Sequence, residues 1–194
     1  MNKLSKIERL TLINQYTILA KLSAEDHEKE DYELKIEILE NGFERRYRDL
    51  IDFLFEPMPE EDSIYVNDVL DFYEDVHFAF NKLPDDEKDE NLEYKVKFKG
   101  FDLNDAEQSK LYSYADFMIN KYDGWHYLRE LVDAGEIEIN SHGSEVPKHV
   151  LLEYIERHNR IKQEKLINFS TAEPLTKDEL HFIFGLSDNS SSAE

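Results

Sequence analysis

The chain of 194 residues contains no cysteine. Disulfide bonds, thiolate metal ligands and cysteine nucleophiles are therefore excluded together, which suits a protein of the cytoplasm. No apolar run approaches the ~20 residues that a membrane-spanning helix requires. The first ten residues, MNKLSKIERL, also lack the apolar core of a signal peptide. We therefore expect a soluble, cytoplasmic protein that does not enter a membrane.

Glycine is scarce, with six residues that never cluster. Neither the GxxxxGK loop of many nucleotide-hydrolysing proteins nor the GxGxxG turn of dinucleotide-binding folds is present. The sequence also contains no GxSxG elbow and no HExxH pair among its seven histidines. These absences favour a protein without enzymatic activity, and we expect no cofactor and no metal.

Basic residues are outnumbered, with 23 Lys and Arg against 44 Asp and Glu, for a net charge of −21. Residues 51–110 alone carry −12. Such a segment repels phosphate backbones, whereas nucleic-acid-binding proteins usually present a basic surface. The acidic residues form a solvated face, and the alternative is that this face attracts a basic partner.

The remaining composition indicates a folded, mainly α, multihelical protein. Hydrophobic residues make up 40% of the chain and aromatic residues 12%, which is enough for a core. We expect a single domain over residues 1–186, with possible halves 1–83 and 92–186 joined by an acidic connector, 84–91. The polar segment 187–194 is predicted to be disordered.

Two helices are predicted at the start of the chain and are expected to form a hairpin. Ser5 and Glu8 have the spacing of a capping box, which marks the start of a helix. The second helix ends at Gly42, because glycine readily adopts the left-handed conformation found after a helix. Apolar residues recur on one side of the first helix: Ile7, Leu10, Ile13, Leu19 and Leu22.

The hydrophobic period changes only once, in the stretch from Tyr94 to Ile119. Tyr94, Val96 and Phe98 alternate with lysines, which predicts a short strand within residues 94–101. Residues 136–140 alternate in the same way and are a candidate partner strand. The sequence thus predicts a minor strand element in an otherwise helical protein, with a long central helix over residues 60–82.

Six segments stand out by their order and spacing along the chain: ERLTLINQY (8–16), ENGF (40–43), the helix holding Tyr73 and His77, VKFKGFD (96–102), YSYADFMIN (112–120) and LTKDEL (175–180). With these segments the chain resembles the YfbU family of uncharacterised bacterial proteins. The resemblance covers nearly all of residues 3–185 and departs most in residues 124–147. It implies a mainly helical protein with a helix hairpin and a small mixed α/β part, and no established activity, cofactor or catalytic residue.

Polar and aromatic residues on the best-defined elements supply the candidate sites. Tyr73, His77 and Asp102 are candidates for a small-molecule, metal or enzymatic site, although nothing in the sequence shows that they converge. Glu74 and His77 have the E-x-x-H spacing of di-iron proteins, which use two such pairs, and only one is present. An apolar groove lined by Tyr73, Phe101 and Trp125 is a candidate site for a partner helix or a small ligand.

Three hypotheses about function follow. The leading hypothesis is a non-catalytic interaction or regulatory module with a protein partner, which can also form a homo-oligomer. The alternative is a small-molecule- or metal-binding protein or enzyme with a site near Tyr73, His77 and Asp102. The weakest is a nucleic-acid-associated regulator that uses the basic patch Arg45, Arg46 and Arg48, because so acidic a chain is poorly suited to nucleic acid.

Overall fold

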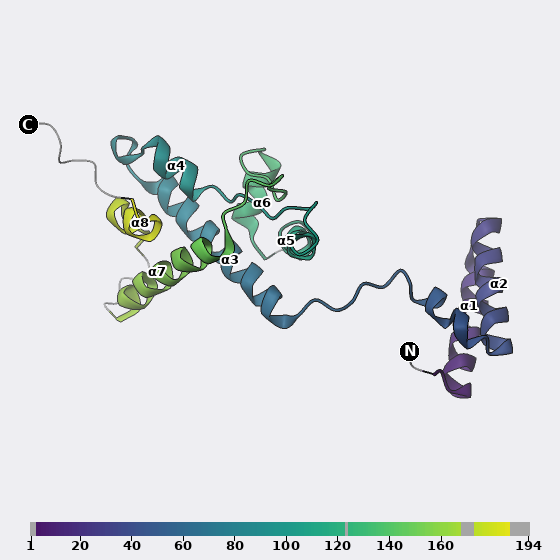
Figure 1. Ribbon diagram of the computed structural model, residues 1–194. Coiled ribbons are helices and arrows are strands. Elements are labelled where there is room, and N and C mark those ends of the chain that lie inside the picture. The colour runs from purple at the N-terminus through teal and green to yellow at the C-terminus, as the bar shows by residue number, and fades with distance from the viewer. Residues whose placement is uncertain (1–2, 123, 168–172, 187–194) are drawn as a thin grey trace, which may run out of the picture. The chain divides into compact units, whose positions relative to one another are not determined.

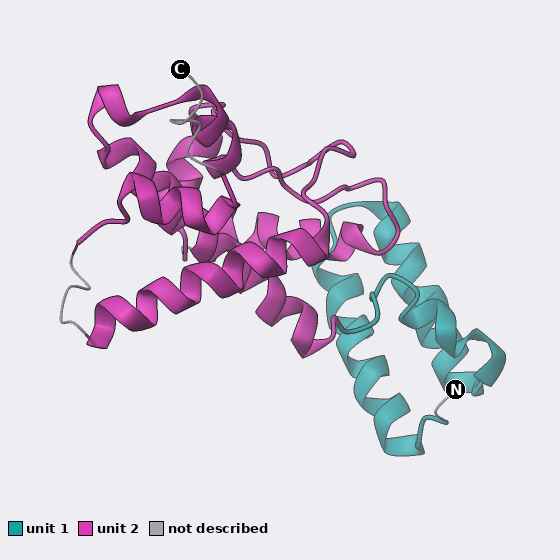
Figure 2. Ribbon diagram, turned by 60° about the vertical axis from the view of Figure 1, so that its left-hand side comes forward, with its two compact units in different colours: residues 1–57 teal, residues 58–194 magenta. Residues whose placement is uncertain are grey.

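A computed structural model describes residues 3–122, 124–167 and 173–186. The chain forms two compact units, residues 1–57 and 58–194, which Figure 2 shows in two colours. The division follows Pro57, which together with Pro59 prevents a continuous helix. The acidic connector 84–91 therefore lies within the second unit, and the predicted halves do not coincide with these two units. The predicted disordered tail, 187–194, lies outside the described residues.

The first unit is the predicted helix hairpin, made of α1 (Lys6–Leu22) and α2 (Asp26–Asn41), followed by the short 3-10 helix η1 (Glu44–Leu50). The capping box is formed: the Ser5 hydroxyl accepts from the Glu8 amide at 3.2 Å, and the Glu8 carboxylate accepts from the Ser5 amide at 2.7 Å. Gly42 ends α2 with a φ of 68°. The predicted hairpin and both of its end signals are confirmed.

The core of the hairpin is small. Arg9 Nη1 donates a hydrogen bond to the backbone oxygen of Leu39 at 3.1 Å, which ties α1 to the end of α2. The Tyr16 and Tyr32 rings stack with centroids 5.9 Å apart. The central buried residues of the hairpin core are Ile38, Leu39, Tyr47 and Leu50, with Leu4, Leu12, Ile13 and Tyr16 packed against them.

The second unit is built around one long helix, α3, as predicted. The helix α3 (Glu60–Lys82) contacts each of the other five α-helices of the unit. It can do so because its buried side chains, which include Val66, Val69, Phe72 and Val76, cover much of its circumference. The surrounding elements are η2 (Asp85–Glu87), α4 (Glu90–Val96), α5 (Gln108–Asn120), α6 (His126–Asp133), α7 (Lys148–Ile167) and α8 (Lys177–Phe184).

The prediction of a strand over Tyr94–Phe98 is wrong, because the helix α4 occupies most of it. The Asp89 carboxylate caps this helix by accepting from the Leu92 amide at 2.9 Å. Leu92 and Val96, four residues apart, are both fully buried against the core, whereas Tyr94 is exposed. A local cap and a helical spacing of buried residues thus prevail over the alternation of apolar residues and lysines.

Extended pairing does occur just after the predicted strand, as one isolated bridge in the described part of the chain. Phe101 pairs in parallel with Asn140: the Phe101 amide donates to the Ile139 oxygen at 2.9 Å, and the Ser141 amide donates to the Phe101 oxygen at 3.1 Å. The candidate partner segment 136–140 therefore does lie beside the predicted strand region 94–101, but the two are paired only at Phe101 and Asn140. The mainly helical fold class is confirmed, and the strand element is reduced to this bridge.

None of the helices described is both long enough and apolar enough to cross a membrane.

Candidate functional site

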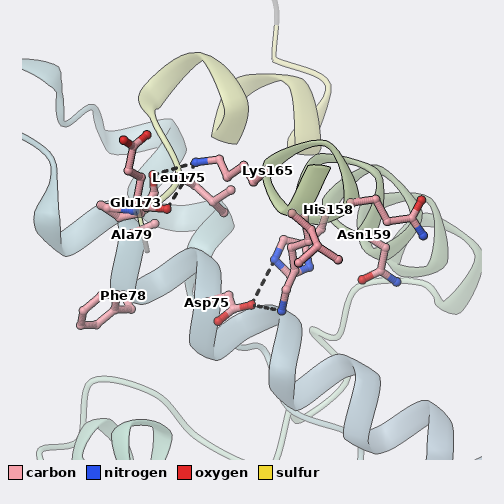
Figure 3. Close-up of a pocket in the computed structure, with 12 residues that line it drawn as sticks. Asp75, Phe78, Ala79, His158, Asn159, Lys165, Glu173 and Leu175 are labelled. Atoms are coloured by element: carbon pink, nitrogen blue, oxygen red, sulfur yellow. Dashed lines mark hydrogen bonds and ion pairs between the residues drawn. The ribbon is translucent and has the colours of Figure 1, made fainter. Parts of the chain in front are cut away.

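The second unit contains a cavity of about 600 Å³. Figure 3 shows that its walls come from α3, from α7 and from the segment that precedes α8. The lining includes apolar side chains, among them the Phe78 ring and the Leu175 side chain. Three charged or titratable side chains gather at another point of the lining: Asp75, His158 and Lys162.

The Asp75 carboxylate links the two helices at this point. One carboxylate oxygen, Oδ2, lies 3.3 Å from His158 Nε2 and 2.7 Å from Lys162 Nζ. The Asp75 side chain is half-buried, and burial alone would raise its pKa. The His158 ring and the Lys162 ammonium outweigh this effect and hold the pKa of Asp75 below its ordinary value. At neutral pH the carboxylate is therefore charged and compensated.

The His158 imidazole is the unusual member of this cluster. Its residue is only 2% exposed, and its Nε2 atom has no hydrogen bond of acceptable geometry among the described residues. The 3.3 Å approach to Asp75 is thus an electrostatic contact that is poorly aligned as a hydrogen bond. A buried polar atom without an aligned partner costs free energy, so His158 has hydrogen-bonding capacity that a polar ligand could satisfy.

This cavity offers charged and polar groups that can bind a polar ligand. None of its described lining residues carries a hydroxyl or thiol group. Lys165, at another part of the lining, is held by the Glu179 carboxylate at 2.9 Å and by the Pro174 oxygen at 2.9 Å. These contacts tie the end of α7 to the start of α8, so Lys165 has a structural role.

A second cavity of about 500 Å³ lies elsewhere in the same unit. Tyr65, Tyr73 and Phe101 line it, and burial raises the pKa of Tyr65 to about 12, so its hydroxyl is neutral. Lys148 Nζ lies 4.4 Å from the centroid of the Tyr65 ring, a cation–π contact that fixes this edge of the cavity.

In the first unit, α1 is apolar on both sides. Leu12, Ile13 and Tyr16 pack against the hairpin core. Residues on the opposite side point outward, and we call them the outer face of α1: Ile7 is 77% exposed, Leu10 57%, Ile18 57% and Leu22 76%. A helix that is apolar all round is normally covered on both sides.

The outer face is also free of charge along its middle. From Leu10 to Ala20 the chain has no Asp, Glu, Lys or Arg, although such residues make up 35% of the protein. An exposed apolar stripe without interspersed charges is typical of a surface that binds another protein.

Comparison with known proteins identifies the family. The family model of the YfbU domain matches residues 1–159, which include all of the first unit and most of the second. The chain belongs to the YfbU family. The UPF0304 protein MJECS11 of Methanocaldococcus jannaschii is 34% identical over 140 residues, which are 72% of this chain and 79% of that protein.

The structure of this YfbU-family chain separates the predicted site residues. Tyr73 and Phe101 line the second cavity, as the predicted groove requires, but Trp125 does not. Trp125 Nε1 donates to Asp71 Oδ1 at 2.8 Å. Asp102 Oδ1 accepts from the Asn104 amide at 2.8 Å and so shapes a turn. Of the triplet formed with His77, only Tyr73 lines this cavity.

His77 is buried in a hydrogen-bonded cluster of its own. Its Nδ1 lies 2.9 Å from the Tyr127 hydroxyl and 3.2 Å from the Asn81 amide nitrogen. The neighbouring Glu74 is partly buried, which raises its pKa, while the backbone amides of Tyr127 and Leu128 oppose that rise. No three His, Cys, Asp or Glu side chains come together in a metal-binding arrangement in the part of the chain that the structure describes.

The stability of the second unit should depend on His77 in mildly acidic solution. Burial lowers the pKa of folded His77, with Glu136 and Glu93 opposing and Lys97 adding to the effect. The unfolded chain therefore takes up the proton first as the pH falls below about 6.5. We expect the free energy of unfolding to decrease between pH 7 and pH 5, and to do so less in His77→Gln. Urea denaturation at both pH values tests this, and equal decreases in the two proteins would contradict it.

The predicted basic patch lies in η1 of the first unit. Arg45, Arg46 and Arg48 are all exposed, and Arg46 is 3.4 Å from the Asp49 carboxylate. This pair is exposed and contributes little free energy. The side chains are accessible, but one of the three charges is already compensated locally.

Two features of the structure were not predicted from the sequence: the contact between Asp75 and His158, and the outer face of α1. Asp75 and His158 are 83 positions apart, so no local spacing relates them, although a histidine within the apolar stripe of α7 was a usable signal. For the outer face, the sequence indicated Ile7, Leu10 and Leu22 but not Ile18. It also grouped them with Ile13, which packs against the hairpin core.

Proposed function

We propose that this YfbU-family protein is a non-catalytic interaction and regulatory module that acts in the cytoplasm, with the outer face of α1 as its docking surface. The observation that carries the proposal is the exposure of Ile7, Leu10, Ile18 and Leu22 on a helix whose other side is already packed. Covering such side chains would contribute roughly 1 kcal/mol or more for each, since more than half of each is exposed.

The two units differ in net charge, and this difference suits them to different roles in such a module. Residues 1–57 carry a net charge of −4, whereas residues 58–194 carry −17. The second unit keeps the protein well hydrated and repels acidic partners, and its acidic face favours a basic partner. The first unit is close to neutral and offers the apolar contact area.

The test compares assemblies of tagged protein isolated gently from its own host by native mass spectrometry. We expect the wild-type chain in a protein assembly of fixed stoichiometry. The double variant Leu10→Glu, Ile18→Glu should be recovered as a bare chain, because both changes place charge on the outer face. The matched control, Ile64→Glu with Leu152→Glu, adds the same charge at exposed apolar positions of the second unit and should retain the assembly. Identical spectra for all three proteins would contradict the proposal.

A second candidate function is small-molecule binding in the cavity at Asp75, His158 and Lys162. The buried His158 Nε2 without an aligned partner favours this cavity over a site at Tyr73, His77 and Asp102. A small-mass adduct that disappears in His158→Phe would support it. Nucleic-acid binding through the three arginines is the weakest candidate, because the whole chain carries −21.

A further inference from the structure

We propose that the outer face of α1 binds the outer face of a second copy of this chain, so that two hairpins form the core of a homodimer. This inference rests on the proposed docking role of α1 and adds the identity of the partner.

The hairpin buries too little apolar surface to be self-sufficient. In its described residues the buried hydrophobic residues are Ala20, Ile38, Leu39, Tyr47 and Leu50. Domains of about 60 residues are marginally stable even with a complete core. The outer face would add a second apolar layer to the hairpin, and two copies joined there would each bury that layer.

The placement of charge allows a second copy of the chain as the occupant. The helix α1 has one acidic and three basic residues, and α2 has seven acidic and two basic residues. When two copies of α1 meet at their outer faces, their uncharged middles lie against each other without like-charge repulsion, and the acidic α2 of each copy stays on the far side of its own α1. A strongly charged partner would find no opposite charge along this middle of α1.

Asn14 lies among the residues of the outer face, between Leu10 and Ile18, and is exposed. Around a two-fold axis its amide can donate to and accept from the same amide of the second copy. A single amide pair in an apolar helix interface fixes register and number of helices at some cost in stability. The outer face thus has both an apolar contact area and a polar group suited to self-recognition.

Sedimentation of the purified full-length chain over a range of concentrations tests the inference. We expect the wild-type protein at micromolar concentration to sediment with twice the mass of the 23.1 kDa chain. Leu10→Glu with Ile18→Glu should weaken the dimer by roughly 100-fold or more, since it places like charges opposite each other. Ile64→Glu with Leu152→Glu should sediment as the wild type does. A wild-type monomer at all concentrations, or a double variant that dimerises normally, would overturn the inference.

If the wild-type chain sediments as a monomer, thiol labelling shows whether the outer face of α1 is covered. Single cysteines can be introduced for this purpose because the native chain has none. The rate for Ile18→Cys is compared with that for Glu28→Cys at an exposed position of α2. Equal rates in a monomer would show an uncovered outer face, so only the identity of the partner would be wrong. A much slower rate at Ile18→Cys in a monomer would show that the chain covers this face itself, and both proposals would fail.

Discussion

Replacing Leu39 with alanine should unfold the hairpin while the second unit stays folded. Leu39 is 0% exposed and lies at the centre of a core with few other buried residues. Removing a buried leucine side chain costs about 2–5 kcal/mol, which is comparable to the whole stability of a small domain. Hydrogen exchange read by mass spectrometry should show rapid exchange throughout α1 and α2 and unchanged protection in α3.

The matched control for this change is Leu34→Ala in the same helix. Leu34 is 56% exposed, so its loss should leave the exchange of α1 and α2 nearly unchanged. The Leu39→Ala protein should also fail to dimerise, because the outer face requires a folded α1. Protection of α1 at the wild-type level in Leu39→Ala would show that the hairpin is held by something other than its own small core.

Replacing Gly100 with alanine should destabilise the second unit by about 2–5 kcal/mol, the sum of two costs. Gly100 has a φ of +75°, a conformation that side chains disfavour. A methyl group there would also lie 2.3 Å from the backbone oxygen of Ile139 and 2.6 Å from its carbonyl carbon. That carbonyl accepts the hydrogen bond of the Phe101 amide, so the backbone cannot move away without breaking the bridge.

Gly135→Ala separates these two costs. Gly135 has a similar φ of +72°, but an added methyl group would have nothing within 4 Å. Its replacement should therefore cost only about 1–2 kcal/mol, the conformational part. Thermal and urea denaturation of the two variants provide the comparison, and equal losses of stability would contradict the proposed contact of residue 100 with residue 139.

Local sequence signals predicted much of this fold because they act within a few residues. The capping box at Ser5, the glycine at the end of α2 and the proline pair before α3 each satisfy or block nearby backbone groups. The prediction of a strand around Tyr94 was wrong because a period of two was inferred from only three apolar residues. Leu92 and Val96 are four residues apart, which is a helical spacing, and the Asp89 side chain caps the first turn of α4. Together these two features favour a helix over a strand.

The candidate site could not be predicted from local sequence signals, because tertiary packing brings its residues together. The contact of Asp75 with His158 depends on the crossing of α3 and α7, which no spacing along the chain encodes. The two sides of α1 are similarly apolar in composition, so the sequence could not show which side packs against α2. Only the packed positions of Leu12, Ile13 and Tyr16 identify the outer face.

The most direct test of a hairpin dimer is a distance between two copies of α1. A single spin label at Gln15→Cys, an exposed position in the middle of α1 outside the four residues of the outer face, gives one label in each chain. Axes of packed helices lie about 8–10 Å apart, so double electron–electron resonance should report one short, narrow distance between labels. The coupling should vanish when Leu10→Glu and Ile18→Glu are added. Isolated spins in the labelled wild-type background, at concentrations where the unlabelled chain is fully soluble, would contradict the dimer.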